Sequence, residues 1–246
     1  MKNTKHIISI LTILAIVIFY LFYRSEMEKL PPVLPKKNTI SQTEVQDCNT
    51  FSTWFDINVC LPDLEGMTEC YDEPKYIDLV HYLVPSSNPT LAYYMNDSTY
   101  IANVESTSIT SSVDDYFWVY ATDGIRGINC TNQELNYMDE LYIEDYPESN
   151  WNNVRRHLET TTGFSVDVPI LLEKYSIYRN IKSYLHLIKF NRNGDTFYMV
   201  YTVNLLLIKN RIIWAAYYKE YEDESSLNET KTKNNSLVLK LFEKNN

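Results

Sequence analysis

The feature that most constrains this chain is an uncharged, apolar run of seventeen residues near its N-terminus, Ile7–Tyr23. A predominantly apolar stretch of about 17 to 25 residues is long enough to cross the hydrocarbon core of a bilayer as a helix. Lys2 and Lys5 precede the run and Arg24 follows it. Since no small-x-small cleavage site ends the run, we interpret residues 1–24 as an uncleaved transmembrane anchor. A cleaved signal peptide and a buried core helix are the alternatives.

The residues after the anchor divide into a linker and one domain. Residues 25–47 include the sequence Leu-Pro-Pro-Val-Leu-Pro, and proline-rich segments act as semi-rigid spacers. The remainder of the chain is long enough for a domain with a substantial hydrophobic core. We therefore predict a Pro-containing linker over 25–47 and a single domain over 48–246.

The predicted external part is strongly acidic. All 32 acidic residues follow the anchor, together with all of the 22 basic residues except Lys2, Lys5 and Arg24. Such a surface repels the phosphates of nucleic acids, so we predict no nucleic-acid partner. The acidity matches a basic protein partner, and it is also an ordinary means by which a domain stays soluble.

The predicted domain contains four cysteines. An even number in an exported domain favours two disulfide bonds and predicts an extracytoplasmic location, periplasmic or extracellular. The cysteines are too far apart in the sequence for a zinc site, which needs closely spaced pairs. The alternative is that the thiols are free and fill the interior as small apolar groups. The candidate disulfide cysteines are Cys48, Cys60, Cys70 and Cys130.

The pattern of hydrophobic residues predicts an α+β fold, an antiparallel sheet covered by helices. Residues 183–190, 197–208 and 211–221 are predicted as consecutive strands of a meander, joined by turns that contain Asn. The spacing of Ser226 and Glu229 is that of a capping box and predicts a closing C-terminal helix. A meander crossed by a helix is an α+β layer.

Two further elements are predicted upstream of the meander. The polar triplet Asn96-Asp97-Ser98 separates the strand-like runs 91–95 and 99–104, which predicts a hairpin. Thr131 and Glu134 have the spacing of another capping box, which predicts a helix beginning there.

The end of the chain resembles that of the PsbP/Mog1-like domains, with a long strand, a tight turn, an aromatic-rich return strand and a closing helix. The resemblance covers residues 164–244 and is carried by Phe197–Ile208, Arg211–Tyr221 and the helix from Ser226. It implies a domain with binding or assembly roles, although a fold does not fix a function.

Two upstream stretches, Cys60–Met67 and Leu91–Asn96, resemble uncharacterised single-span membrane proteins of Bacteroidetes. Because no activity is known for those proteins, this resemblance implies a membrane location and no chemistry. It agrees with the anchor predicted from the apolar run.

Motifs of the common enzyme classes do not occur. The chain has five glycines and lacks the phosphate-binding, dinucleotide-binding and nucleophile-elbow motifs, so we predict no cofactor and no metal site. Adjacent carboxylates point in different directions on a strand or a helix, which disfavours paired acid–base chemistry. A carboxylate-type hydrolase, the alternative, would draw on Asp114, Asp139, Glu144 and His157.

The predicted interaction site is the end of the last strand, where aromatic rings and negative charges occur together. Tyrosine suits partly wet interfaces, and carboxylates attract a basic partner. The competing interpretation is a strand end that leads into a solvated helix start. The candidate residues are Tyr217, Tyr218, Tyr221, Glu222, Asp223 and Glu224.

These expectations combine into one functional prediction. The chain is a single-pass protein, anchored through Ile7–Tyr23, whose non-enzymatic domain binds a protein partner or supports an envelope assembly. The alternatives are the carboxylate-type hydrolase and a cytoplasm-facing immunity or inhibitor protein. Reduced thiols would favour the cytoplasm-facing alternative.

Overall fold

The computed structural model describes most of the predicted domain, and the predicted anchor and linker lie outside the residues that it describes. No helix within the described ranges combines the length and the apolarity needed to cross a bilayer. The described ranges are 48–83, 88–104, 115–144, 155–156, 159–160, 165–192 and 195–246.

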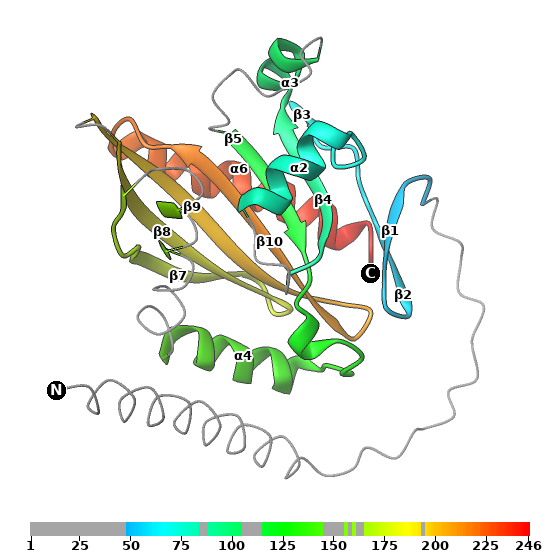
Figure 1. Ribbon diagram of the computed structural model, residues 1–246. Helices are drawn as coiled ribbons and strands as arrows, with labels where there is room; N and C mark the ends of the chain where they lie inside the picture. The colour runs from blue at the N-terminus through cyan, green and yellow to red at the C-terminus, as the bar shows by residue number, and fades with distance from the viewer. Residues whose placement is uncertain are drawn as a thin grey trace, which may run out of the picture. The chain divides into compact units, whose positions relative to one another are not determined.

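An eight-stranded antiparallel sheet forms the centre of the domain (Figure 1). Its order is β3-β4-β5-β10-β9-β8-β6, with β7 also paired to β8. Helix α6 (Glu224–Glu243) packs against one face of the sheet, so the predicted α+β class is confirmed. The strands are β3 (Met67–Glu69), β4 (Thr90–Asn96), β5 (Asp115–Tyr120), β6 (Ser165–Val166), β7 (Ile170–Tyr178), β8 (Ile181–Arg192), β9 (Asp195–Ile208) and β10 (Arg211–Glu220).

The predicted meander is present as β8, β9 and β10. Strands β9 and β10 pair continuously from Ile208 opposite Arg211. The turn between them consists of Lys209 and Asn210, whose φ angles are 48° and 60°. Positive φ at both central residues defines the type I′ turn, whose twist matches that of two paired strands.

Helix α6 starts earlier than the sequence predicted. Asp223 is its N-cap and accepts a hydrogen bond from the backbone N–H of Ser225 at 2.8 Å. The Ser226 hydroxyl accepts from the backbone N–H of Asp223 at 3.3 Å. The predicted start at Ser226 is therefore wrong, because Ser226 is the fourth residue of an Asp-x-x-Ser box and the third residue of the helix. The usual box ends in Glu or Gln, which is why the Ser226–Glu229 spacing was misleading.

The face of the sheet opposite α6 is aromatic. A row of rings crosses five strands, with centroid separations of 5.3, 4.6, 5.1 and 4.8 Å between successive members. Cross-strand aromatic pairs stabilise a sheet beyond the area that they bury. Much of the high tyrosine content therefore serves the interior. The row consists of Tyr93, Tyr116, Tyr218, Tyr201 and His186.

Helices α2 (Pro74–Leu83) and α4 (Asn132–Glu144) pack on this aromatic face, where Tyr76 and Leu135 join its core. The predicted capping box of α4 is confirmed. The backbone N–H of Thr131 donates to the Glu134 carboxylate at 2.7 Å, and the N–H of Gln133 donates to the Thr131 hydroxyl at 3.1 Å. The short 3₁₀ helix η1 (Asp123–Ile125) precedes this helix.

The predicted hairpin around Asn96 is wrong. Strand β4 ends at Asn96, and helix α3 (Asp97–Asn103) follows it directly. The Asn96 side chain accepts a hydrogen bond from the backbone N–H of Ser98 at 3.0 Å, as a helix N-cap does. Asn, Asp and Ser favour both turns and N-caps, so the local sequence does not distinguish the two.

A two-stranded hairpin, β1 (Phe51–Trp54) with β2 (Ile57–Cys60), lies outside the main sheet and carries a disulfide. Cys48 and Cys60 are bonded, with their Cα atoms 5.6 Å apart. Cys70 and Cys130 are free and buried, as the alternative interpretation expected, so they do not form the second predicted bond. Burial raises the pKa of both thiols, which suppresses the reactive thiolate.

Candidate functional site

The structure separates the six residues of the predicted interaction site. Alternate residues of a strand point to opposite faces of the sheet, and side chains or helices pack on both faces here. Tyr217 is 2% exposed and lies in the core on the α6 side. Tyr218 lies on the aromatic side, with its ring stacked between Tyr116 at 4.6 Å and Tyr201 at 5.1 Å. Both rings therefore serve the interior of the domain.

The remaining members gather where β10 passes into α6 (Figure 1), and Tyr198 of β9 joins them. The backbone N–H of Tyr221 donates to the Tyr198 carbonyl at 2.9 Å, and the two rings meet edge to face with centroids 6.4 Å apart. Tyr198 is 39% exposed, and the glutamates around it are exposed as well. We call this surface the acidic corner. It consists of Tyr198, Glu220, Tyr221, Glu222 and Glu224.

Two neighbouring carboxylates already have structural partners. Hydrogen bonds from Ser225 hold the pKa of Asp223 below its usual range, because the Asp223 carboxylate caps α6. Glu229 pairs with Lys219 at 2.7 Å. In the part of the chain that the structure describes, Glu222 and Glu224 form no ion pair. The acidic corner therefore presents unneutralised negative charge beside two tyrosine rings.

Among the residues considered for carboxylate chemistry, Asp139 has described surroundings, and its carboxylate is fully engaged. It accepts a hydrogen bond from the Tyr184 hydroxyl at 2.5 Å and pairs with Lys174 Nζ at 2.9 Å. These contacts fasten α4 to β7 and β8. The side-chain surroundings of Asp114, Glu144 and His157 lie outside the described residues.

His186 lies in the same part of the interior. Its Nε2 is 3.4 Å from the Tyr142 hydroxyl, and its ring stacks on Tyr201 with centroids 4.8 Å apart. Burial lowers the pKa of His186 to about 3, so the imidazole is neutral at physiological pH. A general base is most effective with a pKa near the operating pH, so His186 is suited to packing and not to proton transfer.

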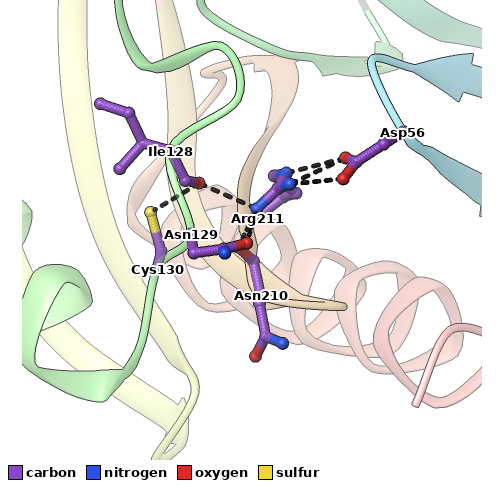
Figure 2. Close-up of polar contacts among 6 residues, drawn as sticks. All are labelled: Asp56, Ile128, Asn129, Cys130, Asn210 and Arg211. Carbon is purple, nitrogen blue, oxygen red and sulfur yellow. Dashed lines mark hydrogen bonds and ion pairs between the residues drawn. The ribbon is translucent and has the colours of Figure 1, made fainter. Parts of the chain in front are cut away.

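At the start of β10, the buried cation Arg211 ties three turns together (Figure 2). Its Nη2 donates to the two Asp56 carboxylate oxygens at 2.9 and 2.6 Å, and its Nε donates to Asp56 at 3.1 Å. Its Nη1 donates to the backbone carbonyls of Ile128 and Asn210 and to the Asn129 side chain. A buried charge is tolerated when it is paired and hydrogen-bonded in this way. We call this arrangement the Arg211 clasp.

A second anchor holds the base of the β1–β2 hairpin. The backbone N–H of Cys60 donates to Asn245 Oδ1 at 2.7 Å, and Asn245 Nδ2 donates back to the Cys60 carbonyl at 2.9 Å. The Asn245 side-chain amide thus makes the two backbone hydrogen bonds that a neighbouring strand would otherwise make with Cys60. With the bond to Cys48 and the Arg211 clasp, the hairpin is fixed at three points.

A buried polar layer fixes α6 on the sheet. The Asn234 carboxamide accepts from Thr202 at 2.6 Å and from Asn204 at 2.9 Å, and it donates to the Tyr175 hydroxyl at 3.2 Å. Because buried polar groups are costly unless paired, this layer favours one position of the helix. Thr202, Asn204 and Asn234 are fully buried, and we assign this layer a structural role.

A groove of about 480 Å³ lies along the outer side of α6. Its lining mixes Glu229 with Lys233 and Lys240, so it favours neither anions nor cations. Lys233 Nζ donates to the Glu65 carbonyl at 2.7 Å, which bridges the groove to the β3 side of the domain. The groove therefore offers no convergent set of groups for one ligand.

Comparison with protein-family models, with curated proteins and with solved structures found no match. Within the described ranges, no group of three or more His, Cys, Asp or Glu side chains is placed to hold a metal ion. The resemblances inferred from the sequence therefore stay predictions, and the function has to be argued from geometry.

The sequence offered little signal for the polar contacts of Arg211 and Asn245. Arg211 and Asp56 are 155 positions apart, and Cys60 and Asn245 are 185 apart. No local pattern links partners so distant. Tyr198 is different, since its place near the start of a strand that pairs with β10 follows from the meander register.

Proposed function

We propose that this chain is a membrane-anchored, non-enzymatic domain that binds a basic protein partner through the acidic corner. The single observation that carries the proposal is the placement of the three exposed carboxylates Glu220, Glu222 and Glu224 beside the rings of Tyr198 and Tyr221. The nearest cation in the sequence, Lys219, is already paired with Glu229.

The chemistry of this surface suits recognition. Tyrosine supplies a large, amphipathic contact area at a low cost in conformational entropy. The backbone hydrogen bond between Tyr221 and Tyr198 fixes the two backbones, and the rings already contact each other edge to face, which reduces the ordering cost of association. Carboxylates around the rings attract a basic partner and raise the rate of encounter.

The cysteines support an extracytoplasmic position of the domain. A disulfide such as Cys48–Cys60 persists in oxidising compartments, whereas cytosolic thiols stay reduced. This favours attachment through Ile7–Tyr23 with the domain outside over the alternative of a cytoplasm-facing immunity or inhibitor protein. The hydrolase alternative gains no support from Asp139, whose carboxylate is occupied by Lys174 and Tyr184.

The test is a binding titration with a defined cationic probe, a peptide of ten lysines, and the full chain in neutral nanodiscs. The variant E220Q/E222Q/E224Q removes three charges at the acidic corner. The matched control D63N/D72N/E140Q removes three charges from exposed positions elsewhere. We expect the corner variant to weaken binding at least tenfold and the control to weaken it less than twofold. Equal losses would mean that only the overall charge matters and would contradict the proposal.

Photo-crosslinking in native membranes extends the test to the natural partner. A photoreactive phenylalanine derivative at Tyr221 is expected to give one protein adduct that the corner substitutions abolish. The same group at Tyr137 of α4, which is 54% exposed, serves as the control and is expected to give none. An adduct of equal intensity at both positions would argue against a localised site.

A further inference from the structure

The turn of the β1–β2 hairpin places an aromatic ring where a glycine is usual. Phe55 has a φ of 53° and is 52% exposed. A bulky residue rarely adopts this left-handed conformation, and hairpin turns of this kind normally use Gly, Asn or Asp. Backbone strain that the fold maintains at an exposed position is a reason to look for a function.

Cationic groups surround this ring. The edge of the Phe55 ring packs closely on Gly127. A Cβ atom added to this glycine would lie 3.2 Å from the ring. The guanidinium carbons of Arg126 and Arg211 are 6.0 and 5.7 Å from the ring centroid. Lys209 reaches the same hairpin and donates to the Asn58 carbonyl at 2.7 Å. We call Phe55, Arg126 and Lys209 the hairpin tip.

The charge of this end differs from that of the rest of the domain. The Asp56 carboxylate is neutralised by the buried Arg211 guanidinium, so it does not cancel the exposed Arg126. Lys209 is exposed as well, and Asp123 is the remaining carboxylate of the neighbouring loop. The tip thus carries a net positive charge in a domain with a large acidic excess.

We propose that the hairpin tip rests on the membrane surface, with the Phe55 ring among the lipid headgroups and Arg126 and Lys209 against anionic phosphates. The inference rests on the proposed function, because it takes Ile7–Tyr23 as the anchor. Aromatic rings and basic side chains are the groups that favour the membrane interface. Such a contact turns the acidic corner, at the opposite end of β10, away from the bilayer.

The length of the chain before the domain makes this contact accessible. The predicted linker over 25–47 spans at most roughly 80 Å, the limit set by about 3.3–3.6 Å per fully extended residue. The seven positions from Cys48 to Phe55 add at most about 24 Å in extended form. The tip is therefore within reach of the surface that holds the anchor. Tethering keeps the local concentration in the millimolar range, so a weak contact is sufficient.

The test uses the full chain in nanodiscs of phosphatidylcholine with about 30% phosphatidylglycerol, the anionic lipid that attracts basic side chains. A photoreactive phenylalanine derivative replaces Phe55 in one variant and Ile101 in the control. Ile101 is 67% exposed on α3, beyond the far end of β4. We expect lipid adducts, measured by mass spectrometry, to be at least fivefold more abundant at position 55. Pure phosphatidylcholine or the variant R126Q/K209Q is expected to reduce them at least threefold.

The possible failures are distinguishable. Retention of the chain after alkaline extraction, with no excess of lipid adducts at position 55, would overturn the membrane contact and leave the anchor intact. Release by alkaline extraction would overturn the anchor and the contact together. An adduct to another copy of the chain or to a different protein would make the tip a protein interface and overturn the proposal. Detection of the Cys48–Cys60 bond in the labelled variants confirms folding, and Phe51, 51% exposed, is the second labelling site if position 55 does not fold.

Discussion

The two ends of β10 differ in both charge and burial. At its start, Arg211 is 6% exposed as a side chain and makes six hydrogen bonds to groups from three turns. At its end, Glu222 and Glu224 are exposed and have no ion pair within the described residues. Ten residues, roughly 33 Å of strand, separate these environments.

The difference shows how one strand serves both stability and recognition. A buried cation whose donors are all hydrogen-bonded fixes loops that lack the backbone hydrogen bonds of a sheet. Exposed charges without partners contribute little to stability, and they remain available to a ligand. We therefore expect substitutions at the first end to change the free energy of unfolding, and substitutions at the second end to change binding.

The largest effect is expected from Arg211→Met. The substitution leaves Asp56 without its cation and removes the guanidinium donor from the Ile128 and Asn210 carbonyls, so we expect a loss of about 3 kcal/mol. This loss lies in the lower part of the range for removing one partner of a buried ion pair, because the Asp56 side chain is 53% exposed. Urea denaturation measures it, and Lys219→Met at the other end is the control, with no measurable change expected. Similar losses for both variants would remove the contrast between the ends.

The loss of stability in acid is expected to come from the buried His186 and not from either end of β10. The pKa of His186 is lowered to about 3 in the folded state, whereas the unfolded value is about 6.5. As pH falls below 6.5, the unfolded chain binds the proton first, so stability that is complete above pH 6.5 is lost progressively toward pH 3. The contribution of His186 amounts to about 2 kcal/mol between pH 7 and pH 5.

The measurement is the free energy of unfolding from pH 7 to pH 5. The variant His186→Phe keeps a ring against Tyr201 and is expected to show a shallower dependence by this amount. The corner variant E220Q/E222Q/E224Q is expected to follow the wild-type profile. A His186→Phe profile parallel to that of the wild type would show that this histidine does not govern the acid response.

A smaller effect is expected at the base of the hairpin. Asn245→Ala removes the hydrogen bonds of both backbone polar groups of Cys60 with the side-chain amide, and we expect a loss of about 1.5 kcal/mol. The neighbouring variant Asn246→Ala is the control, because its amide reaches only the Phe242 carbonyl. Thermal unfolding distinguishes the two variants, and equal midpoints would mean that the disulfide alone holds this end.

The smallest effect on stability is expected from the corner variant itself. E220Q/E222Q/E224Q removes mutual repulsion and no ion pair of the described residues, and it also removes the favourable interaction of Glu224 with the N-terminus of α6. Because these small effects oppose each other, its unfolding midpoint is expected to equal that of the wild type. The same variant is expected to lose binding to the ten-lysine peptide. A large drop in its midpoint would show that the acidic corner is part of the folding scaffold.

Periodicity in the sequence predicted the meander because a strand that pairs with its neighbour along the chain needs only local information. Thr131 and Glu134 predicted the start of α4 for the same reason. The turn-like triplet at Asn96 failed because its residue types suit both a hairpin and an N-cap. For the site, the sequence located Tyr221 and the carboxylates but did not reveal that Tyr217 and Tyr218 pack inward.

What the sequence determined by itself was the α+β class, the order of the last three strands, the closing helix and the acidic character of the domain. Each follows from residue spacing or from a sum of charges. Only the tertiary structure decided that Cys48 pairs with Cys60, and that Arg211 and Asn245 hold a hairpin far away in the chain. These contacts depend on which distant segments lie side by side, and long-range packing sets that arrangement, not any local pattern.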